Sequence, residues 1–268
     1  MAKRYGVPVA NQASPQSESA DFDAIVTRML TPSRTAMRPS TVAWERRESL
    51  DFGSGPLAYW VAGTGPPVLL VHGWATAHAD MDAFVAPLLA RGSSVVGLDL
   101  PAHGESAGAT ATLSDCADAI AALGASLGPL AGAIGHSAGC PSIAMALELG
   151  LRAERVALVA TPQRYERFVR WYAGEVAVEV DALIAAFRQR GVDVTAFDLP
   201  VTASRLEVPA LIVHSVDDRT CEIRGARAVA AAWRGSEFVE VDGLGHSRIL
   251  RDASVIERVS DFIAGHRG

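Results

Sequence analysis

Short, continuous apolar segments alternate with amphipathic segments along most of this sequence. The apolar segments include PPVLLVHG (66–73), SSVVGLDL (93–100) and VPALIVHS (208–215), and segments with helical spacing such as LSDCADAIAALGASLG (113–128) lie between them. A continuous apolar run is typical of a strand buried on both faces, and the alternation of such strands with helices is typical of a mostly parallel sheet. The sequence therefore predicts an α/β fold with helices on both faces of the sheet.

Two parts of the chain depart from this alternation. RESLDF (47–52) and LAYWVAG (57–63) are separated only by GSGP, which predicts a hairpin and an antiparallel edge of the sheet. From about residue 162 to residue 207 there is no apolar strand, only two helical segments with several aromatic residues. We expect this insertion, residues 162–207, to form a small helical lid over the carboxyl edge of the sheet.

The N-terminal part of the chain differs in composition from the rest. Its first residues are polar, and DFDAIVTRML (21–30) has the spacing of one short amphipathic helix. The prolines and hydroxyl residues that follow this segment oppose regular structure, as in a linker. We therefore divide the chain into an N-terminal arm with a possible short helix, residues 1–45, and one large α/β domain, residues 46–268.

Composition and charge argue against several classes of function. The 268-residue chain has a formal net charge of −6, which does not favour binding to nucleic acid. No segment is long and apolar enough to cross a bilayer, and the N-terminus lacks the apolar core of a signal peptide, so we expect a cytoplasmic protein without a membrane partner.

The sequence offers no motif for a cofactor. Cys116, Cys140 and Cys221 lack the spacing of a zinc or redox site, and we expect them to be buried free thiols. No cluster of metal ligands is visible, and no phosphate-binding loop or dinucleotide-binding motif follows a strand. We therefore expect neither a metal nor an organic cofactor.

The segment Gly135-His136-Ser137-Ala138-Gly139 has the pattern G-x-S-x-G. An apolar strand precedes it and a helix follows it directly, as a nucleophile elbow requires. In such an elbow, a strained turn lifts the serine hydroxyl above the sheet edge, and the glycines let neighbouring backbone pack closely. We predict that Ser137 is a nucleophile; the simpler alternative is a glycine-rich turn whose serine caps a helix.

A serine hydroxyl needs a base to accept its proton, and histidine suits this role at neutral pH. His246 lies in VDGLGHSRIL (241–250), a loop between the last strand and the last helix, at the same carboxyl edge as Ser137. An acid is needed to orient the imidazole and to stabilise its charged form. Asp217 and Asp218 both follow a buried strand at this edge, and the residues alone do not decide between them. The other histidines have structural explanations at strand ends, in turns or at exposed positions: His72, His78, His103, His136, His214 and His266.

Acyl transfer also requires donors for the negative charge that develops on the carbonyl oxygen. The backbone amide of Ala138, directly after the serine, is one candidate. The second is the amide of Trp74, in the loop that follows the apolar strand 66–73, although the Trp74 side chain also suits packing under the lid.

Four motifs, in order and spacing, resemble those of the α/β-hydrolase superfamily over residues 47–265. His72-Gly73-Trp74 resembles its oxyanion loop, residues 99–106 resemble its D-x-P/R-G-x-G-x-S turn, and residues 135–139 resemble its nucleophile elbow. Asp218 and His246 resemble the late acid and base of the family, whose usual spacing from the strand end favours Asp218 over Asp217.

This sequence departs from the family pattern in two places beside the predicted site. His103 stands where glycine is commoner, and Cys140-Pro141 follows the elbow where glycine or alanine is usual. Neither departure touches the three predicted catalytic residues, but both are placed to reshape an acyl pocket.

The resemblance implies an α/β-hydrolase fold with an eight-stranded, mostly parallel sheet, helices on both faces and a small helical lid. It also implies a serine hydrolase that cleaves carboxylic esters or thioesters of small to medium apolar acyl groups through an acyl-enzyme. Its partner would be a small-molecule ester-type substrate, and we expect no nucleic acid or membrane partner. A carbon–carbon bond hydrolase or an acyltransferase would use the same triad, and a non-catalytic binding module could keep the same scaffold. The sequence does not indicate an oligomeric state.

Overall fold

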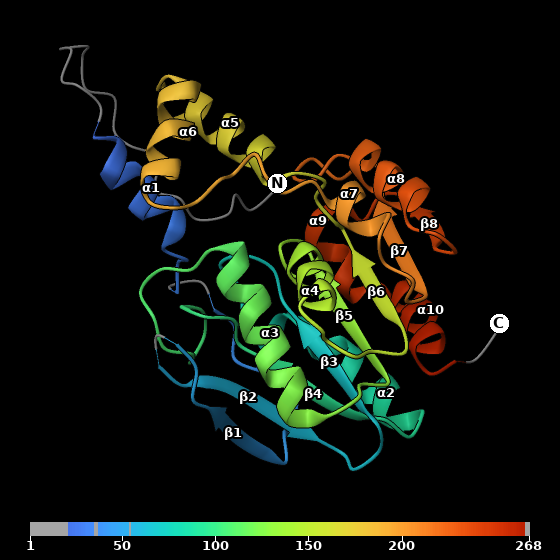
Figure 1. The fold of residues 1–268 in the computed structure, drawn as a ribbon. Helices are drawn as coiled ribbons and strands as arrows, with labels where there is room; N and C mark the ends of the chain where they lie inside the picture. The colour runs from blue at the N-terminus through green and yellow to red at the C-terminus, as the bar shows by residue number, and fades with distance from the viewer. Residues whose placement is uncertain (1–20, 35–36, 54, 266–268) are drawn as a thin grey trace.

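The computed structural model describes residues 21–34, 37–53 and 55–265, and these form one eight-stranded sheet in the order β1-β2-β4-β3-β5-β6-β7-β8 (Figure 1). The strands are Arg46–Leu50 (β1), Leu57–Ala62 (β2), Pro67–Val71 (β3), Ser94–Leu98 (β4), Gly132–His136 (β5), Val156–Val159 (β6), Ala210–Ser215 (β7) and Glu237–Val241 (β8). β2 runs antiparallel to β1 and β4, whereas the remaining neighbours are parallel. The predicted mostly parallel sheet with an antiparallel hairpin at one edge is confirmed.

Helices cover both faces of the sheet because its central strands are apolar on both sides. The helices on one face are α3 (Leu113–Leu127), α4 (Gly139–Glu148), α7 (Leu199–Ala203) and α8 (Ile223–Ala232). Those on the other face are η1 (His78–Phe84), α2 (Val85–Ala90), η2 (Ile249–Arg251) and α10 (Ala253–Ile263). Because the central strands are parallel, the turns that leave β3, β5, β7 and β8 all lie at one edge of the sheet.

Local sequence explains where two of these helices begin. The 3₁₀ helix η1 gives way to the α-helix α2 at Val85. Pro87 explains the break, because it has no amide hydrogen for a preceding turn and is tolerated only near the start of a helix. Helix α3 is capped by Thr112: the Thr112 hydroxyl accepts from the Asp115 amide at 3.1 Å, and the Asp115 carboxylate accepts from the Thr112 amide at 2.8 Å.

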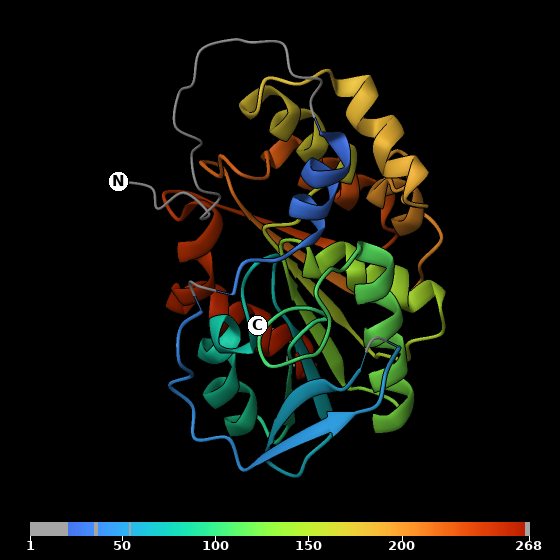
Figure 2. The same ribbon diagram turned by 90° about the vertical axis from the view of Figure 1, so that its left-hand side faces the viewer.

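The insertion contains α5 (Tyr165–Glu175) and α6 (Val180–Gln189) and ends with the short α7, one helix more than the two segments expected from the sequence. α1 (Phe22–Leu30), the helix expected in the arm, packs against α6 and shares a hydrophobic cluster with α5 and α6 that is separate from the two clusters on the sheet. Figures 1 and 2 both show α1 beside α6, and Figure 1 shows both helices on the side of the sheet toward which the β6 arrow points.

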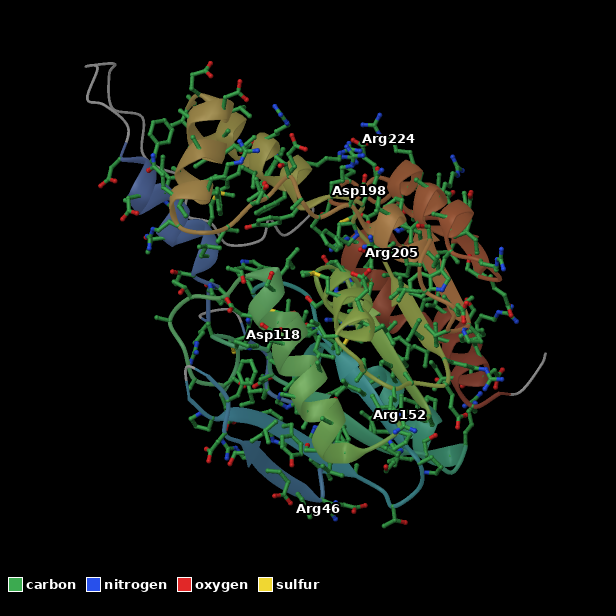
Figure 3. All side chains as sticks on the ribbon, in the orientation of Figure 1. Arg46, Asp118, Arg152, Asp198, Arg205 and Arg224 are labelled. Atoms are coloured by element: carbon green, nitrogen blue, oxygen red, sulfur yellow. The ribbon has the colours of Figure 1, made fainter. Side chains whose placement is uncertain are left out.

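Polar contacts fix α1 and the insertion in place. The Arg190 guanidinium, just after α6, lies 2.6 Å from the Asp23 carboxylate of α1. The base of the insertion is narrow, because Arg164 and Asp198 form an isolated antiparallel bridge and an ion pair. Figure 3 labels Asp198, which lies at this base directly before α7. The arm and the insertion, far apart in sequence, therefore form one helical layer.

Among the residues that the structure describes, no helix combines the length and the apolar character that a bilayer span requires.

Val26→Ala tests whether α1 stabilises the insertion. Val26 is fully buried in the cluster shared with α5 and α6, so its truncation should cost about 2 kcal/mol and speed amide hydrogen exchange in α6. Asp23→Ala, which removes an exposed ion pair, is the control and should change stability by less than about 1 kcal/mol. Unchanged exchange in α6 of the Val26→Ala variant would show that α1 does not support the insertion.

Candidate active site

Ser137 lies at the sharp turn between β5 and α4. Its φ of 51° is in the left-handed region that non-glycine residues rarely adopt, and its amide donates to the carbonyl of Val159 at 3.0 Å. The turn needs glycines on both sides. A Cβ at Gly139 would lie 2.6 Å from the Val71 carbonyl oxygen, and one at Gly135 would lie 3.0 Å from the Cys140 nitrogen. The predicted strand–turn–helix setting of Ser137 is present in the structure.

The loop that follows β3 packs against this turn. A Cβ at Gly73 would lie 3.1 Å from both the Ser137 Cβ and the His136 Nδ1, which is tighter than an ordinary contact, so glycine favours this close approach of the loop. The next residue is Trp74, whose ring meets the ring of His103 edge-on at a centroid distance of 4.9 Å. The loop therefore brings the Trp74 backbone to the vicinity of Ser137.

The side chains of Ser137, His246 and Asp218 are joined by two successive hydrogen bonds. The His246 Nε2 is 3.0 Å from the Ser137 Oγ, and the His246 Nδ1 is 2.8 Å from the Asp218 Oδ2. His246 belongs to the short helix α9 (Gly245–Arg248) rather than to the loop expected from the sequence. Positive φ angles of 74° at Gly243 and 58° at Gly245 let the chain turn from β8 into this helix. The structure thus brings together the three side chains selected from the sequence.

The second oxygen of Asp218 is held by backbone. Its Oδ1 accepts from the amides of Thr220 at 2.8 Å and Cys221 at 3.0 Å. Burial alone would raise the pKa of Asp218, but the hydrogen bond and charge of His246 together with these two amides lower it below its usual value. Asp218 therefore stays ionised at neutral pH.

Asp217, the alternative acid, accepts a hydrogen bond from the backbone before His246 and not from the His246 imidazole. Its Oδ1 accepts from the Gly245 amide at 2.9 Å and from the Ser215 hydroxyl. The Ser215 Oγ in turn accepts from the amides of Leu244 at 3.2 Å and Gly245 at 3.1 Å. The hydrogen bond to Ser215, followed by that to Gly245, lowers the pKa of Asp217. Asp217 thus anchors the turn that leads into His246.

The two backbone amides proposed from the sequence for an oxyanion lie close to Ser137. Ala138 directly follows Ser137 and is the N-cap of α4, so its amide belongs to the positive end of that helix. Within the described parts of the chain, neither the Ala138 amide nor the Trp74 amide donates to a protein acceptor.

Cys221 is a neighbour of Ser137 that the sequence did not reveal. Burial, followed by the charge of Asp218, keeps the pKa of its thiol well above the usual value. All three cysteines are free; Cys116 and Cys140 are buried as expected, whereas Cys221 is only partly buried. The one available signal was its position three residues after Asp218, on a loop at the carboxyl edge.

The two departures from the family pattern are accommodated within the core. His103 donates from Nδ1 to the Pro101 carbonyl at 2.8 Å, and its ring packs between those of His72 and Trp74. The Cys140 thiol donates to the Gly135 carbonyl at 3.2 Å. Pro141 lies in the first turn of α4, where a missing amide costs little.

Ligands for a metal ion do not gather at this site. Over residues 21–34, 37–53 and 55–265, no group of three or more His, Cys, Asp or Glu side chains is arranged to hold one.

Two buried histidines beside the site make stability depend on pH. Burial lowers the pKa of both His103 and His136 to about 3, whereas histidine in an unfolded chain titrates near pH 6.5. Between these values the unfolded chain binds more protons, so the folded state loses stability as the pH falls below about 6.5. Each of these histidines contributes up to about a tenfold change in the folding equilibrium per pH unit.

Urea unfolding at pH 7.5, 6.0 and 5.0 should therefore give a steadily decreasing free energy of unfolding. His136→Gln removes one of the two groups and should weaken the pH dependence. Equal stability at pH 7.5 and pH 5.0 would contradict the burial of neutral histidines.

Several solved structures have the same fold as this chain. The chain is similar to an esterase from Exiguobacterium antarcticum (17% identity, 80% of this chain and 98% of that chain covered, TM-score 0.66). It is also similar to a thermophilic esterase from Thermogutta terrifontis (21%, 82% and 98%, TM-score 0.64) and to a bromoperoxidase from Bacillus anthracis (16%, 82% and 100%, TM-score 0.64). At these low identities, the structural similarity shows a common fold and nothing further.

No curated protein sequence matches the chain. The profile of the alpha/beta hydrolase family matches residues 68–258, a segment that contains the turn of Ser137, Asp218 and His246. The match extends over more than half of the chain, and the protein belongs to the α/β-hydrolase family.

Proposed function

We propose that this protein is a serine hydrolase that cleaves carboxylic esters or thioesters with small to medium apolar acyl groups. The observation that carries the proposal is the continuous chain of hydrogen bonds from Ser137 through His246 to Asp218. A serine in a strained turn, a histidine on its hydroxyl and a buried carboxylate on that histidine are the parts required for nucleophilic acyl transfer.

The geometry suggests a role for each group. As the Ser137 Oγ attacks the substrate carbonyl carbon, the His246 Nε2, 3.0 Å away, accepts the hydroxyl proton. Asp218 accepts from the Nδ1–H, which keeps the imidazole in the required tautomer and stabilises its protonated form. The low pKa of Asp218 suits this role, because the carboxylate remains charged.

The amides of Ala138 and Trp74 complete the proposed machinery as donors to the oxyanion of the tetrahedral intermediate. Collapse of this intermediate breaks the bond to the alcohol or thiol, which receives the proton from His246 and leaves an acyl group on Ser137. A water molecule, deprotonated by His246, then attacks the acyl-enzyme, and a second tetrahedral intermediate releases the acid and restores the Ser137 hydroxyl.

We also propose that the helical layer of α1, α5 and α6 acts as a lid of the domain 46–268, with the insertion running from about 162 to 207. Its aromatic residues divide into two groups. Tyr172 and Phe187 form the core of the lid, whereas Phe168 and Trp171 are exposed on α5. Phe197 packs instead against the hydrophobic cluster that lies between the sheet and the face covered by α4.

The arginines of the lid do not favour an acidic substrate. Arg164, Arg167 and Arg170 form ion pairs with Asp198, Glu222 and Glu166, respectively. These pairs neutralise the charge of the helix face, which agrees with an apolar small molecule as the substrate. Two of the similar solved structures are described as esterases, which supports the same class of reaction.

Ser137→Ala tests the nucleophile. The variant should lose at least about 10³-fold in kcat on p-nitrophenyl acetate and butyrate, because no other group would form the acyl-enzyme. A fluorophosphonate should label the wild type at Ser137, as located by peptide mass spectrometry, and should not label the variant. The unfolding transition should be preserved as a control. Turnover by the pure, folded variant would refute the assignment of Ser137.

Asp218→Asn and Asp217→Asn separate the roles of the two aspartates. Asp218→Asn should lower kcat by about 10³–10⁴-fold, because an amide cannot hold the imidazole tautomer that accepts the serine proton. Asp217→Asn keeps an oxygen that can accept from Gly245, so we expect a loss within about tenfold. The measurement is ester hydrolysis over pH 5–9, and the reverse ranking would assign the acid to Asp217.

A further inference from the structure

The carbonyl group of His246 forms a hydrogen bond with the segment that carries Ser137. The Nε2 of His136, the residue before Ser137, lies 2.9 Å from the His246 carbonyl oxygen. A carbonyl can only accept a hydrogen bond, so the proton of His136 is on Nε2. This hydrogen bond joins two segments that are 110 residues apart in sequence.

We infer that His136 is a positioning residue, which sets the distance between the proposed base His246 and the proposed nucleophile Ser137 by fixing the backbone of His246. The inference rests on the proposed function for its effect on catalysis. Because His136 and Ser137 are adjacent on the elbow, the bond from His136 ties the base to the same rigid turn that carries the nucleophile.

The opposite side of His246 is held independently. Ser215 accepts from the amides of Leu244 and Gly245, and Asp217 accepts a second time from Gly245. The turn 243–246 is thus fixed to β7 through its amides and to β5 through its carbonyl. The hydrogen bond that Asp218 accepts from the His246 Nδ1 fixes the orientation of the imidazole ring. It does not fix the position of the His246 backbone, from which the ring extends.

The surroundings of His136 keep it neutral. It is 2% exposed, its Nδ1 has no partner among the described residues, and its ring centroid lies 4.9 Å from that of His246. Burial first, and then the positive charge that His246 can carry, lower the pKa of His136 to about 3. A neutral ring at this distance does not repel the imidazolium that His246 becomes when it accepts the serine proton.

Packing alone would also place an aromatic ring here, and three substitutions distinguish packing from hydrogen bonding. Glutamine has an amide nitrogen near the position of the histidine Nε2 and can still donate to the His246 carbonyl. Asparagine is shorter and places its amide near the Nδ1 position, away from that carbonyl. Leucine fills the space without any donor. His136→Gln is therefore the conservative variant, and His136→Asn and His136→Leu are the two that lose the bond.

The first measurement is steady-state hydrolysis of p-nitrophenyl butyrate, with urea unfolding to verify that each variant is folded. We expect His136→Asn and His136→Leu to lower kcat by about 10²-fold with KM within about threefold, since a displacement of about 1 Å has such an effect on rate. His136→Gln should retain kcat within about tenfold, and its pH profile of kcat/KM should keep the wild-type midpoint because His136 is not the base.

The second measurement, amide hydrogen exchange of residues 243–248, does not depend on activity. Exchange should be faster in His136→Asn and His136→Leu than in the wild type and in His136→Gln. A wild type without ester turnover or fluorophosphonate labelling would contradict the proposed function, while the exchange rates would still test the placement of His246. Wild-type exchange in the Asn and Leu variants, or equal losses of kcat in all three folded variants, would overturn the positioning role.

Discussion

The left-handed backbone at Ser137 is the constraint on which the site depends. A φ of 51° at a residue with a side chain costs of order 1 kcal/mol or more, and the surrounding structure must offset it. It does so with close packing: Gly135, Gly139 and Gly73 let α4 and the loop after β3 pack against the turn at distances where a methyl group would clash or be crowded. The Ser137 amide also donates to β6, so the turn is tied to the sheet itself.

This rigid turn determines how the remaining parts are placed. Each group that faces Ser137 follows the carboxyl end of a parallel strand, and each is fixed by hydrogen bonds to backbone as well as by side-chain contacts. Asp218 is held by two amides of its own loop, and the segment that leads into His246 is held by Ser215 and Asp217. Such double support matters because an active site needs its groups within a fraction of an ångström of the productive arrangement.

The helical layer above the sheet has a different physical character. Its hydrophobic cluster is separate from those of the sheet, the base of the insertion is narrow, and part of the layer comes from the N-terminal arm. The core of this layer does not include the residues packed around Ser137. The layer and the edge that carries Ser137 are therefore stabilised by separate hydrophobic clusters.

Much of this arrangement was determined by the sequence alone. The alternation of apolar and amphipathic segments specified the parallel sheet, because strands buried on both faces must be apolar throughout, and G-x-S-x-G between a strand and a helix specified the turn at Ser137. The residues around His246 and Asp218 could be assigned to the same edge because parallel strands share one carboxyl end. The spacing of apolar residues also located α1, although it did not show that α1 packs against α6.

Other features were decided only by the tertiary structure, since they depend on contacts between segments distant in sequence. The residues alone did not distinguish Asp218 from Asp217, and only the resemblance to the family favoured Asp218. In the structure, Asp218 contacts the imidazole and Asp217 contacts an amide because of the direction in which the chain leaves β7. For the same reason, the sequence could not show that Cys221 meets Ser137, that α1 packs on α6, or that His136 donates to the carbonyl of His246. The sequence determined which residue types reach the edge of the sheet, and long-range packing decided which atoms meet there.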